Sequence, residues 1–151
     1  MESKKSIIDS ATSTLKLESE AILGLINYID DDFVETVNTI LNSRGRVIVT
    51  GIGKSAIIAQ KIVATFNSTG TPAVFMHAAD AVHGDLGMIQ KDDVVLCLSK
   101  SGNTPEIKLL APLLKLSGNK LVGMLGNINS DLAKQADLIL NTTVEKEACP
   151  H

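Results

Sequence analysis

Apolar residues recur at three- and four-residue steps through the first part of the chain, which is the spacing of one face of a helix. Asp30-Asp31-Asp32 interrupts this stripe and offers a carboxylate cap for a second helix. We therefore expect an N-terminal helical segment over residues 1–42, in which the two helices pack on a neighbouring layer or subunit. The apolar positions of the two stripes are Ile8, Ala11, Leu15, Ile22, Leu25, Ile26 and Ile29, and then Phe33, Val37, Ile40 and Leu41.

After Arg46 the pattern changes to short apolar runs that alternate with helical stretches. The runs predict five strands, and the stretches between them predict helices or turns. This alternation is typical of βαβ units, so we expect an α/β fold with a parallel sheet. In such sheets, ligands bind beyond the carboxyl ends of the strands. The expected strands cover residues 47–49, 73–75, 94–98, 121–125 and 138–140. One helix is expected directly after Gly53, and further helices or turns are expected over 78–86, 104–117 and 130–136.

Composition narrows the class of function. The chain has 151 residues, of which 44% are hydrophobic and 21% charged, so it is long and apolar enough to fold around a core. A net charge of −3 and an aromatic content of 3% disfavour nucleic-acid binding, and no apolar run is long enough to span a membrane. Cys97 lies in an apolar run, and the N-terminus lacks the apolar run of a signal peptide. We expect a cytoplasmic protein that binds a small metabolite.

Two glycines and a lysine follow the first expected strand, in Gly51-Ile52-Gly53-Lys54-Ser55-Ala56. Read as Gly-x-Gly-x-x-Ala, the segment matches the dinucleotide fingerprint only weakly, because no acid ends the second strand. It is not a P-loop either, since Ile48 occupies the position of the first glycine. A lysine at a helix N-terminus favours an anion, and the alternative is a tight turn that binds nothing.

Hydroxyl side chains gather after the third expected strand, in Ser99-Lys100-Ser101-Gly102-Asn103-Thr104. Hydroxyl and backbone N–H donors at a helix N-terminus make a phosphate cradle without a metal, and the alternative is an ordinary capped loop. Candidate acids and bases are His77, His83, Glu106 and Glu147, and the last three also have an ordinary structural explanation. The sequence contains no CxxC or HExxH spacing, so we expect no metal site and no cofactor.

Together these motifs resemble the sugar isomerase (SIS) domain family, and more specifically the D-arabinose 5-phosphate isomerases of the Kdo pathway. The Ser-x-Ser-Gly-x-Thr element is typical of phosphosugar binders in general. The segments that begin at His83 and at Lys146 are more specific to these isomerases. The matching segments are Gly51–Ser55, His83-Gly-Asp-Leu-Gly87, Ser99–Thr104 and Lys146-Glu-Ala-Cys-Pro150, together with residues 64–72.

The resemblance implies a three-layer αβα sandwich around a five-stranded parallel sheet, and a homotetramer with shared active sites. It also implies interconversion of D-ribulose 5-phosphate and D-arabinose 5-phosphate for lipopolysaccharide or capsule synthesis. Residues 1–151 would form a single SIS domain, with an α/β core at 43–151, without CBS domains and without the C-terminal part of the family domain. Two rival interpretations are a non-catalytic phosphosugar sensor and an isomerase of another sugar phosphate.

The resemblance also assigns residues to the site. Ser55, Ser99, Ser101 and Thr104 would hold the phosphate, and we include their loop neighbours Gly53 and Lys100 among the substrate-binding residues. An aldose–ketose isomerase needs a base, an acid and a donor for the developing enediolate. The residues expected at the reacting end are Glu147 as the base with Glu106 as the alternative, His83 as the acid or for opening the ring form of the sugar, and Lys54 for the oxyanion.

Overall fold

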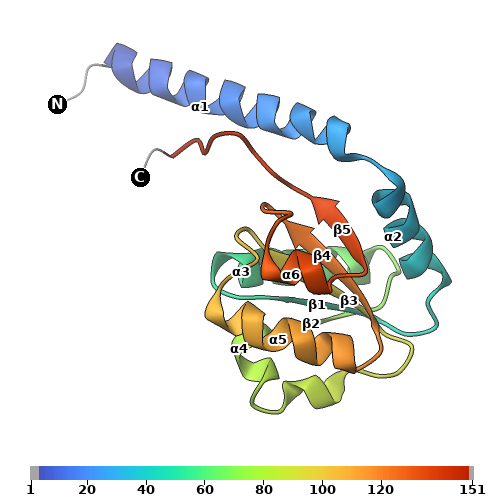
Figure 1. Ribbon diagram of the computed structural model, residues 1–151. Helices are drawn as coiled ribbons and strands as arrows, with labels where there is room; N and C mark the ends of the chain where they lie inside the picture. The colour runs from blue at the N-terminus through green and yellow to red at the C-terminus, as the bar shows by residue number, and fades with distance from the viewer. Residues whose placement is uncertain (1–3, 150–151) are drawn as a thin grey trace.

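The computed structural model describes residues 4–149, which alternate helices and strands as the sequence predicts (Figure 1). The helices are α1 (Lys4–Gly24), α2 (Asp31–Asn42), α3 (Lys54–Ser68), α4 (Ala78–Ala81), α5 (Pro105–Leu116) and α6 (Asp131–Gln135), with the 3₁₀ turns η1 (Leu25–Tyr28) and η2 (Asp85–Met88). The strands are β1 (Val47–Gly51), β2 (Ala73–His77), β3 (Val94–Ser99), β4 (Lys120–Leu125) and β5 (Leu138–Asn141).

All five strands pair in parallel, in the order β2-β1-β3-β4-β5. The central strand β3 is buried along its whole length, as its uninterrupted apolar sequence predicts for a strand covered on both faces. Because the strands are parallel, the segments that follow β1, β3, β4 and β5 leave the same edge of the sheet. The predicted α/β class and parallel sheet are confirmed.

Helices cover both faces of the sheet, which makes three layers (Figure 1). Side chains alternate between the two faces along each strand, so β1 sends Ile48 to one face and its neighbours Val47 and Val49 to the other. On the first face the strands pack against α4, α5 and α6, and on the second they pack against α3 and, through Ile40, α2. The expected αβα sandwich is therefore present.

The two N-terminal helices behave differently from each other. Helix α2 is capped by Asp30, whose side chain accepts a hydrogen bond from the amide of Phe33, as predicted. Asp32 ties this helix to the sheet, because its carboxylate accepts a 2.8 Å hydrogen bond from the amide of Ile139 at β5. Helix α1 extends away from the body and buries none of its residues (Figure 1). It ends at Gly24, before the 3₁₀ turn, rather than continuing to Ile29 as one helix.

A buried carboxylate connects two strands at the end of the sheet where the strands begin. The side chain of Asp93 is 1% exposed and accepts hydrogen bonds from the Arg46 guanidinium at 2.7 Å and from the Arg46 and Gln90 amides at 2.8 and 2.9 Å. Burial alone would raise the pKa of Asp93, but these hydrogen bonds and the Arg46 charge bring the pKa below its ordinary value. The carboxylate therefore joins the starts of β1 and β3.

Candidate functional site

A cavity of about 400 Å³ opens at the carboxyl edge of the sheet. It lies where the loops after β1, β3 and β4 meet, which is the place that a parallel sheet offers to a ligand. Its lining brings together five of the residues predicted to bind substrate, which come from two separate loops. The lining residues are Ile52, Ser55, Ser99, Lys100, Ser101, Thr104, Gly126 and Asn127.

The loop after β1 approaches the cavity through a glycine turn into α3. Gly53 is the N-cap of this helix and has a φ of 59°, a backbone conformation that glycine adopts at little cost. Ser55, in the first turn, lines the cavity and is half-buried. Lys54 is the first residue of α3 and is exposed; it is next to the lining but is not part of it. The turn thus presents the start of a 15-residue helix to the cavity.

The loop after β3 is held in shape by its own serines. Ser99 is 6% exposed, and its Oγ accepts a 3.0 Å hydrogen bond from the amide of Gly102. Ser101 Oγ accepts a 3.2 Å hydrogen bond from the amide of Asn103. A hydroxyl that accepts in this way still has its own hydrogen to donate. Both serines are therefore suited to shape the loop and to donate to an anion.

Thr104 is the N-cap residue of α5, but its side chain does not cap the helix. Its Oγ1 is buried and has no hydrogen-bond partner among the described residues, although the residue lines the cavity. Unpartnered buried hydroxyls are rare in folded proteins and call for an explanation. Pro105 at the next position has no N–H to be satisfied. The first-turn amides of α5 are thus left without the cap that threonine normally provides.

Glu147 reaches the same loop from the end of the chain. Residues 142–149 follow β5 without regular secondary structure, and Glu147 forms an ion pair with Lys100. Both side chains are more than half exposed. This pair joins a predicted substrate-binding residue to the predicted base. Sequence alone did not predict this contact, because the two residues are far apart in the chain.

The other predicted catalytic residues are less closely associated with the cavity. Glu106 is in the first turn of α5, two residues after Thr104, and is half-buried. His83 is exposed in the turn between α4 and η2, and its amide donates a hydrogen bond to the carbonyl of Asp80. Neither residue is part of the cavity lining, so the structure does not bring all four catalytic candidates together within one chain.

Three lining residues were not among the predicted site residues. Gly126 and Asn127 follow β4, and Ile52 lies between the two glycines of the first loop. The rule that ligands bind beyond the carboxyl ends of strands applies equally to β4. A Gly-Asn pair directly after that strand was the signal that could have identified them.

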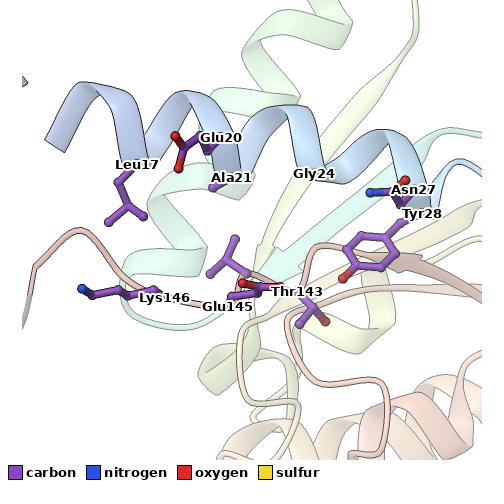
Figure 2. Close-up of a pocket in the computed structure, with 10 residues that line it drawn as sticks. Leu17, Glu20, Ala21, Gly24, Asn27, Tyr28, Thr143, Glu145 and Lys146 are labelled. Atoms are coloured by element: carbon purple, nitrogen blue, oxygen red, sulfur yellow. The ribbon is translucent and has the colours of Figure 1, made fainter. Parts of the chain in front are cut away.

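A second hollow of about 390 Å³ separates α1 from the segment that carries Glu147 (Figure 2). Tyr28 extends down from the end of η1 toward Thr143 in this hollow, while Lys146 extends beneath Leu17. The segment after β5 therefore borders two sites, with Glu145 and Lys146 facing α1 and Glu147 paired with Lys100.

Three further features of residues 4–149 concern metal binding, thiol chemistry and membranes. In that range no three His, Cys, Asp or Glu side chains cluster closely enough to hold a metal ion. Cys97 is fully buried, and burial raises the pKa of its thiol to about 12, which keeps it protonated and inert. No described helix is long and apolar enough to cross a membrane.

Comparison with known proteins gives one family and several relatives. Residues 40–150 match the SIS domain family. The chain is 52% identical to arabinose 5-phosphate isomerase KdsD of Pseudomonas aeruginosa over 143 residues, and 44% identical to arabinose 5-phosphate isomerase GutQ of Escherichia coli over 146 residues. These matches cover 95% and 97% of this chain but only 44% and 46% of the relatives, so the chain spans less than half their length.

A solved structure extends the match to nearly the whole chain. An Escherichia coli CFT073 protein in complex with a sugar phosphate superposes with a TM-score of 0.92 at 39% sequence identity. The match covers 99% of this chain and 79% of that one. At this identity the two proteins are similar in sequence as well as in fold.

Proposed function

The chain belongs to the SIS domain family, and from this premise we propose that it is an aldose–ketose isomerase of a sugar phosphate. Its substrates in this proposal are D-ribulose 5-phosphate and D-arabinose 5-phosphate. The observation that carries the proposal is the cavity at the sheet edge, where the uncapped start of α5 meets Ser55, Ser99 and Ser101. Relatives named arabinose 5-phosphate isomerase, at 52% and 44% identity, support the choice of substrate.

The phosphate group occupies the hydroxyl-lined part of the cavity. Helix N-termini attract anions because unpaired amides and the helix dipole both favour negative charge. Helices α3 and α5 both begin at this cavity, and Ser55 and Thr104 add hydroxyl donors. The phosphate is remote from the reacting carbons, so its binding energy serves to position them.

Isomerisation then moves one proton between two neighbouring carbons. The base removes the proton from C2 of the aldose, the C2–H electron pair forms the enediolate, and the same proton or one from solvent is delivered to C1. We assign Glu147 as the base, with Glu106 as the alternative in the first turn of α5. His83 exchanges the hydroxyl proton, and the Lys54 ammonium stabilises the enediolate oxygen.

Assembly is part of the same proposal, because none of the four catalytic candidates lines the cavity of its own chain. We infer a homotetramer in which subunits share sites. Helix α1 buries nothing and leaves Leu15, Ile22 and Ile26 more than 60% exposed. An apolar groove of about 490 Å³ between α2 and α3, lined by Val37 and Phe66 among others, is also uncovered. Apolar surface of this extent is typical of an interface.

The product indicates which pathway the reaction serves and in which compartment it takes place. Arabinose 5-phosphate would supply Kdo synthesis for lipopolysaccharide or capsule, as the resemblance implies. A phosphate ester is charged and does not cross a bilayer unaided. We therefore place the protein in the cytoplasm, together with its charged substrates.

One observation favours a second candidate, a non-catalytic phosphosugar sensor. Such a module needs the phosphate cradle but not His83, Glu106 and Glu147, and none of these three residues lines the cavity within one chain. Incubation of the protein with arabinose 5-phosphate, followed by detection of ribulose 5-phosphate, separates the two. An isomerase forms ketose and exchanges the migrating hydrogen with deuterium from solvent. Thermal stabilisation by the sugar phosphate without either reaction would overturn the isomerase and support the sensor.

A further inference from the structure

Lys100 connects the phosphate cradle to the assigned base, since it lines the cavity and pairs with Glu147. We propose that Lys100 is a positioning residue whose ammonium pairs with Glu147 before substrate binds and moves to the phosphate when the cradle is filled. Binding of the phosphate thereby frees the Glu147 carboxylate. This inference rests on the proposed function, because it places a phosphate in the Ser99–Thr104 loop.

The exposure of the pair makes such an exchange feasible. The Lys100 side chain is 64% exposed and the Glu147 side chain 59%. Ion pairs this accessible to water are weak, because water competes with each partner. A sugar phosphate carries close to two negative charges at neutral pH and accepts several hydrogen bonds. It is therefore the stronger competitor for a single ammonium group.

Gly126 provides the fixed point about which the lysine moves. A Cβ atom at position 126 would lie 2.9 Å from the carbonyl oxygen of Lys100 and 3.1 Å from its Cγ, so the stem of the lysine rests against this glycine. Thr143 Oγ1 lies 3.1 Å from the carbonyl oxygen of Gly126 and 2.6 Å from Asn141 Oδ1, so the single hydroxyl hydrogen is shared between these acceptors and the segment leading to Glu147 starts against the same glycine. The stem of Lys100 and the start of the segment leading to Glu147 thus both contact Gly126, and the flexible end of Lys100 can reach either anion.

The exchange has a chemical consequence for the base. While Lys100 pairs with Glu147, the ammonium occupies the carboxylate that the proposed reaction needs. Movement of Lys100 to the phosphate leaves the Glu147 carboxylate open to the sugar only when the sugar phosphate is in place.

The test is a double-mutant cycle with inorganic phosphate as the probe, measured by isothermal titration calorimetry on the intact protein. Glu147→Gln keeps the size of the side chain and removes the competitor, so phosphate should bind about twofold to fivefold more tightly, the range expected of an exposed ion pair. Lys100→Met should weaken binding by about fivefold or more, because a charge-assisted contact is lost. In the Lys100→Met background, Glu147→Gln should have no further effect.

Glu145→Gln is the matched control, since it removes the same charge two residues away on the side that faces α1. Its phosphate affinity should equal that of the unmodified protein. Equal tightening by both Gln variants, or tightening by Glu147→Gln that persists without Lys100, would overturn the exchange and leave the phosphate cradle intact. No binding of phosphate at millimolar concentration to any variant would instead overturn the cradle, and with it both proposals.

Discussion

Gly102 and Ser130 meet beneath the phosphate cradle, where a Cβ atom at position 102 would lie 2.0 Å from Ser130 Oγ. Gly102 also has a φ of +64°. Gly102→Ala should therefore lower the free energy of unfolding by a total of about 2–4 kcal/mol. The loss has two causes, the strained backbone conformation and the overpacking against Ser130. Urea unfolding measures the loss, and phosphate binding should weaken with it because the loop is displaced.

Gly70→Ala is the control for this substitution. Gly70 has a φ of +93°, but a Cβ atom there would meet nothing within 4 Å. Its cost should be limited to the backbone, about 1–2 kcal/mol, with phosphate binding unchanged. If the two alanine variants lose equal stability, the contact with Ser130 has no energetic role.

Replacement of both cradle serines should weaken substrate binding. In Ser99→Ala/Ser101→Ala, each lost charge-assisted contact is worth about 1–3 kcal/mol, which is read as a rise in KM for the sugar phosphate. Ser117→Ala, at the other end of α5, removes a hydroxyl that donates to the carbonyl of Leu114 at 2.7 Å and should leave KM unchanged. An unchanged KM in the double variant would contradict the assignment of the cradle.

The sheet was predictable from sequence because its signals are local. A continuous apolar run such as Val94–Leu98 identifies a strand covered on both faces, and Asp30 identifies a helix start through its own hydrogen-bonding capacity. The edge rule for parallel sheets then placed Ser55 and the Ser99–Thr104 loop near each other without any knowledge of distances.

The rest depends on contacts that a one-dimensional pattern does not record. The sequence predicted a helix over 104–117, but only the structure reveals that the Thr104 hydroxyl at its start does not cap the helix. The Lys100–Glu147 pair depends on the path of the chain after β5, where no periodicity constrains the backbone. The apolar stripe of α1 predicted a packed helix, yet one chain alone does not cover it.

Acid should destabilise the fold through Asp93. Its folded-state pKa lies below the unfolded value of about 3.9, so its contribution is complete above that pH and is lost as pH falls through the folded pKa. Asp93→Asn should lower the free energy of unfolding at pH 7 by about 1–3 kcal/mol and flatten its decline below pH 4. Asp9→Asn, at an exposed position on α1, should leave stability at pH 7 and this decline unchanged. If the free energy of unfolding declines equally below pH 4 in the unmodified protein and in Asp93→Asn, Asp93 is not the group that makes the fold sensitive to acid.

The apolar stripe of α1 should hold the oligomer together. Leu15→Glu/Ile22→Glu introduces two charges at positions that are 67% and 68% exposed in the single chain. If another subunit covers them, the charges are costly only in the assembly, and light scattering should show a smaller species. Leu116→Glu, at an 82% exposed site ending α5, should leave the mass unchanged. Tetramers of equal stability in all variants would exclude α1 from the interface.

Glu147→Gln should separate chemistry from binding. The amide is nearly isosteric with the carboxylate but does not accept a proton from carbon, so kcat should fall by about 10²–10⁴-fold. KM should change by no more than about fivefold, because the contacts of the cradle with the phosphate remain. Exchange of the migrating hydrogen with solvent deuterium should fall in parallel with kcat, since both need the same proton abstraction. Glu145→Gln should retain full turnover and exchange. If Glu147→Gln exchanges deuterium at the rate of the unmodified protein, Glu147 is not the base; Glu106→Gln, in the first turn of α5, should then show the loss instead.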